Sequence, residues 1–157
     1  MGETNLIGTR RISKRRKVLL AGTTLVLVFI FVQSILPQSV SADESGWVTE
    51  KILGPIFRQF GSQPPSQHAV RKAAHVLEFA VLSALLLLCF RGNVLNCVGA
   101  GFSSAFLDES LQMLSGRGAE IGDVWIDLIG IVAGTLLGLL IRKAALALRD
   151  RKAKNTD

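Results

Sequence analysis

The sequence predicts an all-α membrane protein, a four-helix transmembrane bundle with both termini in the cytosol. The chain has 157 residues, of which 49% are hydrophobic and only 19% charged. Soluble domains usually have about 25% charged residues, so this chain is apolar for its size. Four apolar stretches are long enough to cross a membrane, and basic residues gather beside them. Together these observations indicate one helical membrane domain.

The first predicted span covers residues 18–36, after a polar and basic tail of residues 1–17. Pro37 ends this uncharged run. Val40-Ser41-Ala42 resembles a signal-peptidase site, so cleavage of this segment is the alternative. The apolar run is longer than the usual signal-peptide core of about 7–15 residues, which favours a retained helix.

The first outer loop, residues 37–68, is predicted to contain an interfacial amphipathic helix. Lys51, Arg58 and Gln59 fall largely on one side of it, and Gly54-Pro55 is expected to kink it. A lid over an outer site is the alternative interpretation. Apolar residues recur at helical spacing along the other side: Trp47, Val48, Ile52, Leu53, Ile56, Phe57 and Phe60.

The remaining spans are predicted at residues 70–90, 94–114 and 121–141, and residues 142–157 form a second basic cytosolic tail. Tight turns at Arg91-Gly92-Asn93 and Ser115 to Gly118 connect them. The transmembrane domain is therefore residues 18–141. Each tail has six Lys or Arg residues, so the positive-inside rule predicts cytosolic termini. Five of the 18 basic residues fall outside: Lys51, Arg58, Arg71, Lys72 and Arg117.

The net charge of +6 does not indicate nucleic-acid binding, because the basic clusters flank apolar runs. Cys89 and Cys97 lack metal-ligand spacing and are interpreted as apolar thiols. The predicted location is the cell membrane, which the chain crosses several times, with the lipid bilayer as its surroundings.

Ionisable and amide side chains within the spans are the candidate functional residues. Such groups are costly in a bilayer and normally face the protein interior, where they pair or function. At 1.5 Å per residue, His75, Asp108 and Asp127 each lie roughly 8–9 Å from the outer end of their span. We therefore expect one outer polar site, with Arg117 above it in a turn. Its residues are His75, Glu78, Asp108, Glu109, Gln112, Arg117, Asp123 and Asp127.

The face of Asp123 and Asp127 continues along the fourth span as Gly130, Gly134 and Gly138. Small residues at this spacing let a neighbouring helix approach closely. The sequence predicts close helix packing below the carboxylates.

The polar site has two interpretations: a network that holds the helices together, or an outward-facing pocket. Within the pocket interpretation, the set has metal-ligand types, but a single histidine is sparse for zinc. No serine or cysteine lies in a nucleophile motif. The sequence therefore predicts no metal and no cofactor, and it leaves open whether the protein is an enzyme.

Two motifs resemble the VanZ-like family of bacterial membrane proteins. The first is Arg71-Lys72-x-x-His75-x-x-Glu78-Phe79, and the second is Asp108-Glu109-x-x-Gln112 followed by Gly116-Arg117, Asp123, Asp127, Gly130 and Gly134. Asp127 stands where many members have Asn. The resemblance implies a helical membrane protein. The founding member is associated with resistance to the glycopeptide teicoplanin, and the family offers no catalytic residue to transfer.

The leading hypothesis is a cell-envelope protein that binds or modifies an amphiphile at the outer leaflet, such as an envelope lipid, a peptidoglycan precursor or a lipophilic glycopeptide. The alternative is a non-enzymatic accessory bundle that partners an envelope machine. A proton-coupled transporter is disfavoured, because the acids occupy one leaflet and the first span offers no polar path. A homodimer or another membrane-protein partner fits so thin a bundle.

Overall fold

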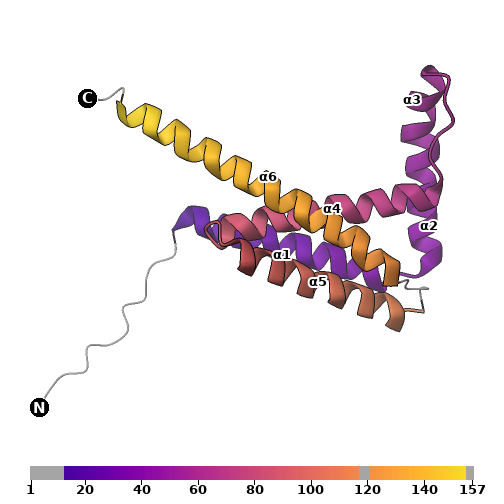
Figure 1. Ribbon diagram of the computed structural model, residues 1–157. Coiled ribbons are helices and arrows are strands. Elements are labelled where there is room, and N and C mark those ends of the chain that lie inside the picture. The colour runs from indigo at the N-terminus through magenta and orange to yellow at the C-terminus, as the bar shows by residue number, and fades with distance from the viewer. Residues whose placement is uncertain (1–12, 117–120, 155–157) are drawn as a thin grey trace, which may run out of the picture.

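The computed structural model describes residues 13–116 and 121–154, and this part of the chain is helical without strands (Figure 1). Four long helices run beside one another: α1 (Lys14–Ile35), α4 (Gln67–Cys89), α5 (Val94–Leu114) and α6 (Ile121–Lys154). Three short helical segments, α2 (Gln38–Trp47), η1 (Val48–Leu53) and α3 (Gly54–Gln59), connect α1 to α4. The predicted all-α class is confirmed.

Local signals explain where the long helices begin and end. Ser13, Ser66 and Asn93 are the N-caps of α1, α4 and α5, and each side chain accepts a hydrogen bond from the backbone N–H three residues later. The helix α1 stops before Pro37, whose ring disfavours helical backbone in the preceding residue. Arg91 and Gly92, both with positive φ, reverse the chain between α4 and α5.

Three helices extend beyond the predicted spans. The N-caps Ser13 and Ser66 make α1 and α4 begin a few residues earlier than predicted. These first residues are mostly polar, so they do not belong to the apolar runs that predicted the spans. The helix α6 continues to Lys154, past the predicted end at residue 141. Alanine and leucine between residues 144 and 148 are strong helix formers, so the helix continues beyond its most apolar part.

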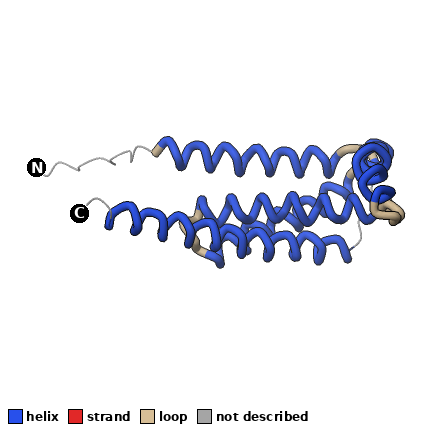
Figure 2. Tube along the Cα trace, turned by 90° about the horizontal axis from the view of Figure 1, so that it is seen from above, coloured by secondary structure: helices blue, strands red, loops and turns tan. Residues whose placement is uncertain are grey.

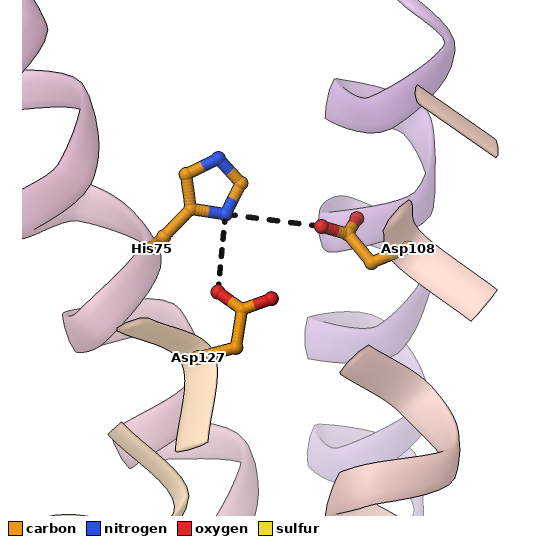
Figure 3. A group of neighbouring side chains, drawn as sticks. All are labelled: His75, Asp108 and Asp127. Carbon is orange, nitrogen blue, oxygen red and sulfur yellow. Dashed lines mark ion pairs between the residues drawn. The ribbon is translucent and has the colours of Figure 1, made fainter. Parts of the chain in front are cut away.

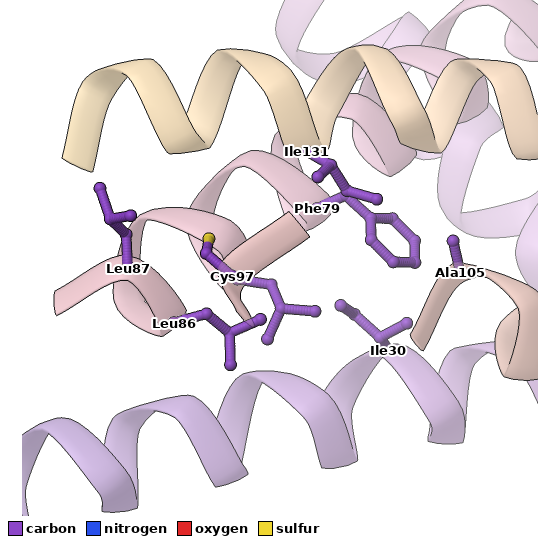
Figure 4. Packing of buried hydrophobic residues seen from close by; sticks show 8 residues of the cluster. Ile30, Phe79, Leu86, Leu87, Cys97, Ala105 and Ile131 are labelled. Atoms are coloured by element: carbon purple, nitrogen blue, oxygen red, sulfur yellow. The ribbon is translucent and has the colours of Figure 1, made fainter. Parts of the chain in front are cut away.

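The helix α4 is central, because it packs against α1, α5 and α6. The apolar core lies between these four helices and draws residues from each of them (Figure 4). Phe79, Leu82 and Leu87 of α4 are fully buried within it. Cys97 also belongs to the core, and its thiol donates to the backbone carbonyl of Ser83 at 3.2 Å. Both cysteines are free thiols.

The glycine face of α6 lies against the backbone of α4. A Cβ atom added at Gly130 would lie 2.5 Å from the carbonyl oxygen of Val76, and one at Gly134 would collide with the backbone of Ala80. At Gly138 the nearest atom is a methyl of Leu87, at 2.9 Å. The absence of side chains here lets the two helices approach to backbone contact.

Within the described residues, three helices are long and apolar enough to cross a membrane: α1, α4 and residues Gly122–Arg149 of α6. Large apolar side chains such as Val28, Phe106 and Leu137 remain exposed on the long helices, as expected where lipid covers them. The helix α5 is not among the three, because Asp108, Glu109 and Gln112 lower its hydropathy. A fourth crossing and the cytosolic position of the termini therefore stay predictions.

The short segments form an arm that lies across one end of the long helices (Figures 1 and 2). The predicted amphipathic helix began at Trp47, whereas the arm is helical from Gln38. A π-helical stretch leads into Gly54-Pro55, the position of the predicted kink, and Gly54 N–H donates to the carbonyl of Thr49. Pro55 lacks an N–H group, and the wider turn accommodates its ring. Trp47, Ile56 and Phe60 are exposed, so an interfacial position stays a prediction.

The two ends of the long helices differ in charge. We call the end beside the arm the acidic end, because Asp108, Asp123 and Asp127 lie in the last turns of α5 and the first turns of α6. The opposite end, called the basic end, has a cavity of about 460 Å³ between α1, α4 and α6. Five exposed arginines line that cavity: Arg15, Arg16, Arg91, Arg142 and Arg149.

Candidate functional site

At the acidic end, three helices bring one histidine and two aspartates together (Figure 3). His75 of α4 directs its Nδ1 atom toward a carboxylate oxygen of Asp127 at 3.6 Å and one of Asp108 at 3.8 Å. Asp108 belongs to α5 and Asp127 to α6. We call these three residues the His–Asp–Asp cluster. It brings together residues that are far apart in the sequence, as predicted from their similar depth in the three spans.

Asp108 is fully buried and held on both oxygens. The hydroxyl of Ser34 in α1 donates to Oδ1, and the amide of Gln112 donates to Oδ2 at 2.8 Å. Gln112 lies one helical turn after Asp108, so the pair shares a face of α5. These two donors fix the orientation of the carboxylate toward His75.

Asp127 is also buried, with 1% of its surface exposed, but its surroundings differ. Neither of its oxygens accepts a hydrogen bond from a residue in the described part of the chain. Within the cluster, Asp127 therefore interacts through its ion pair with His75. A buried carboxylate without hydrogen bonds is costly in an apolar environment, so this residue is not explained by stability.

Asp123 lies one turn before Asp127 and faces a cation. Its Oδ1 atom is 3.3 Å from the Nζ atom of Lys72 in α4. Both side chains are about one-third exposed, so this ion pair lies at the rim of the site. It contributes at most about 1 kcal/mol, as is typical of ion pairs that water reaches.

Two glutamates complete the predicted set among the described residues. Glu109 is 4% exposed and Glu78 is half-buried. Asp127 lies within electrostatic reach of both, as well as of Asp108 and Asp123. Neither glutamate belongs to the His–Asp–Asp cluster. Arg117, which was expected above the site, lies outside the described residues.

Two cavities adjoin the cluster. One of about 40 Å³ is lined by Gln38, Arg71, Lys72, His75, Gln112, Asp123 and Ile126. The other, of about 170 Å³, lies between the arm and α4 and includes Ser41, Glu44 and Glu78 in its lining. Arg71 and His75 line both cavities. The site thus combines buried carboxylates with cationic side chains at its opening.

Sequence reasoning missed Ser34 and did not include Arg71 and Lys72 in the site. The first span was expected to offer no polar path, and its Ser34 was not considered as a partner of the site, although it is buried against Asp108. The sequence did contain a signal for Ser34. Thr23, Ile30 and Ser34 recur at helical spacing on one face of α1, and they are the buried residues of that helix. Arg71 and Lys72 were counted among the outer basic residues and in the first family motif, but not among the site residues.

This combination of apolar helices and one buried polar cluster defines a helical membrane protein with a specialised site at one end. The chain belongs to the VanZ/LLP1 family, whose model matches residues 15–142. That range covers α4 and α5 in full, α1 from its second residue, and α6 as far as Arg142. It also includes all three residues of the His–Asp–Asp cluster. The predicted resemblance is therefore confirmed. No curated protein and no solved structure matches the chain.

Proposed function

We propose that this protein binds the anionic head group of an envelope amphiphile at the acidic end, in the leaflet predicted to be the outer one. The observation that carries the proposal is the pair of cavities that share Arg71 and His75 at the end of otherwise apolar helices. Polar cavities at membrane depth are costly to maintain, and intramembrane ionisable residues generally serve a function.

The cations at the opening favour an anionic ligand. Arg71 presents a guanidinium, which matches the geometry of phosphate and carboxylate groups and binds them through two parallel hydrogen bonds. Lys72 adds a second positive charge, although it already pairs with Asp123. In this proposal Arg71 is the residue that contacts the anionic group.

Cavity size narrows the choice of ligand. A volume of about 40 Å³ holds roughly three waters at the minimum of about 10–15 Å³ that each water needs. The second cavity, of about 170 Å³, has room for a few further groups. Cavities of this size favour a compact head group, such as the phosphate end of a lipid or of a lipid-linked precursor, over a whole glycopeptide antibiotic.

The proposal requires that the first helix is retained. Ser34 donates to Asp108, and the hydroxyl of Ser115 donates to the backbone carbonyl of Ser34 at 3.1 Å. Cleavage after Ala42 would remove these contacts from the site. The role of α1 in orienting Asp108 therefore supports a retained helix over a signal peptide.

The second candidate is an accessory protein that docks onto a larger envelope assembly. Its support is the arm, on which Trp47, Ile56 and Phe60 are exposed. The glycine face of α6 is covered by α4, so it is not a free docking surface. Under this alternative, substitutions of the exposed aromatics on the arm should affect function more than substitutions in the cavities.

The test is a search for bound amphiphile. The full chain is purified from bacterial membranes in mild detergent, and co-purifying lipids are identified by mass spectrometry. We expect a phosphate-containing lipid with the wild type and with Arg91→Gln, which alters an arginine at the basic end. The variants Arg71→Gln and His75→Ala should lose it. Equal lipid recovery from all four proteins would contradict the proposal.

A further inference from the structure

We propose that the His–Asp–Asp cluster binds one divalent transition-metal ion. The ligands are His75 Nδ1 and one carboxylate oxygen each from Asp108 and Asp127. Imidazole nitrogen suits Zn²⁺ and related ions, and carboxylate oxygen suits Mn²⁺ as well, so a set of one nitrogen and two oxygens fits Zn²⁺ or Mn²⁺.

The two separations from His75 Nδ1 match those of ligands around one ion. The three ligand atoms all lie within 4.8 Å of one another, and the two distances from His75 Nδ1 are 3.6 and 3.8 Å. Bonds of about 2.0–2.2 Å at trigonal or tetrahedral angles place ligand atoms about 3.3–3.8 Å apart. The side chains already point toward a common centre (Figure 3), so little rearrangement is needed.

Asp127 is the second observation that points to a cation. It is buried and directed at the cluster, and its oxygens accept no hydrogen bond from the described residues. Asp108 differs, because Ser34 and Gln112 hold it. Donors that orient a ligating carboxylate are a usual feature of metal sites. One aspartate is thus positioned by hydrogen bonds, and the other has oxygens available for an ion.

The charge of the region also favours a bound cation. Four further carboxylates lie within electrostatic reach of Asp127: Glu78, Asp108, Glu109 and Asp123. The cations of α4 in the same region are Arg71, Lys72 and, when protonated, His75. Lys72 is engaged with Asp123 at the rim. A divalent ion would reduce the excess negative charge of these carboxylates at buried positions, where water does not compensate it.

The lone histidine argued against a metal in the sequence, because zinc sites usually include more nitrogen or sulfur ligands. The folded arrangement changes that argument. Three ligands from three helices leave coordination positions unfilled, and His75 also lines the small cavity. Three protein ligands plus an open position is the pattern of metal sites that bind an external group. The open position would accept a phosphate oxygen.

That last step rests on the proposed function, whereas metal binding itself does not. The two are tested separately. The full chain in detergent is stripped with a chelator, dialysed against Zn²⁺ and assayed for metal content and thermal unfolding. We expect about one Zn²⁺ per chain and a raised Tm for the wild type. Asp43→Asn, an equivalent change at an exposed site on α2, should behave identically.

Asp127→Asn and His75→Gln should lose the bound Zn²⁺ and the rise in Tm. Ser34→Ala, which removes only an orienting donor, should weaken Zn²⁺ binding by about 10- to 100-fold. Mn²⁺ is tested in the same way by its paramagnetic resonance spectrum. The inference fails if the wild type binds neither ion, or if Asp127→Asn binds as much as the wild type. His75 would then be a protonated partner of two carboxylates.

The lipid assay separates this result from the proposed function. If Zn²⁺ binds but no lipid is recovered, the metal site stands and the head-group proposal fails. If lipid is recovered from a chelator-treated wild type that binds neither ion, the metal inference fails and the head-group proposal stands.

Discussion

At the acidic end of the long helices, carboxylates are buried between α4, α5 and α6, whereas at the basic end five arginines line a wide cavity and remain exposed. Buried charge must be compensated by specific partners, and exposed charge is compensated by water and lipid head groups. The buried carboxylates therefore need specific partners, whereas the exposed arginines do not. The predicted membrane orientation would account for the charge of the basic end, but not for that of the acidic end.

The glycine face of α6 packs against α4 between the acidic and the basic ends, so its loss has the largest expected effect. Gly134→Leu should destabilise the protein by at least about 3 kcal/mol, because the new side chain would collide with the backbone of Ala80. The measurement is unfolding in a denaturing detergent titration. The control is Gly99→Leu, since a Cβ there meets nothing within 4 Å. Similar losses in the two variants would show that α4 and α6 tolerate separation.

The next largest effect is expected at the acidic end. Asp108→Ala removes the acceptor of Ser34 and Gln112 and should cost about 1–2 kcal/mol, in the upper range for hydrogen bonds between membrane helices. Ser110→Ala on the same helix removes only a bond to its own backbone, to Phe106 O, and should have little effect. Equal unfolding midpoints for the two variants would mean that Asp108 does not join α1 to α5.

The smallest effect is expected at the basic end. Arg142→Gln should change the free energy of unfolding by less than about 0.5 kcal/mol, since its side chain is exposed. Thermal unfolding in detergent measures this. A loss as large as that of Asp108→Ala would show that the arginines also hold a structural network, and the contrast between the ends would disappear.

Sequence reasoning predicted the grouping of His75, Asp108 and Asp127 because depth and helical spacing are fixed by a rise of 1.5 Å per residue. It could not predict which carboxylates meet the imidazole, since this depends on helix rotation and crossing. Glu109 adjoins Asp108 in sequence but lies outside the cluster. Ser34 was missed because a serine hardly alters hydropathy, and the first part of the arm was missed because residues 38–46 have no apolar period.

The central claim is that Asp127 is maintained for a ligand and not for the fold. The direct test is thermal unfolding of metal-free, delipidated Asp127→Asn beside the wild type. Because Asp127 accepts no hydrogen bond from the described residues, we expect the Tm of the variant to equal or exceed that of the wild type. A Tm lower by about 3 °C or more, corresponding to about 1 kcal/mol, would show that Asp127 holds the helices together and would contradict the claim.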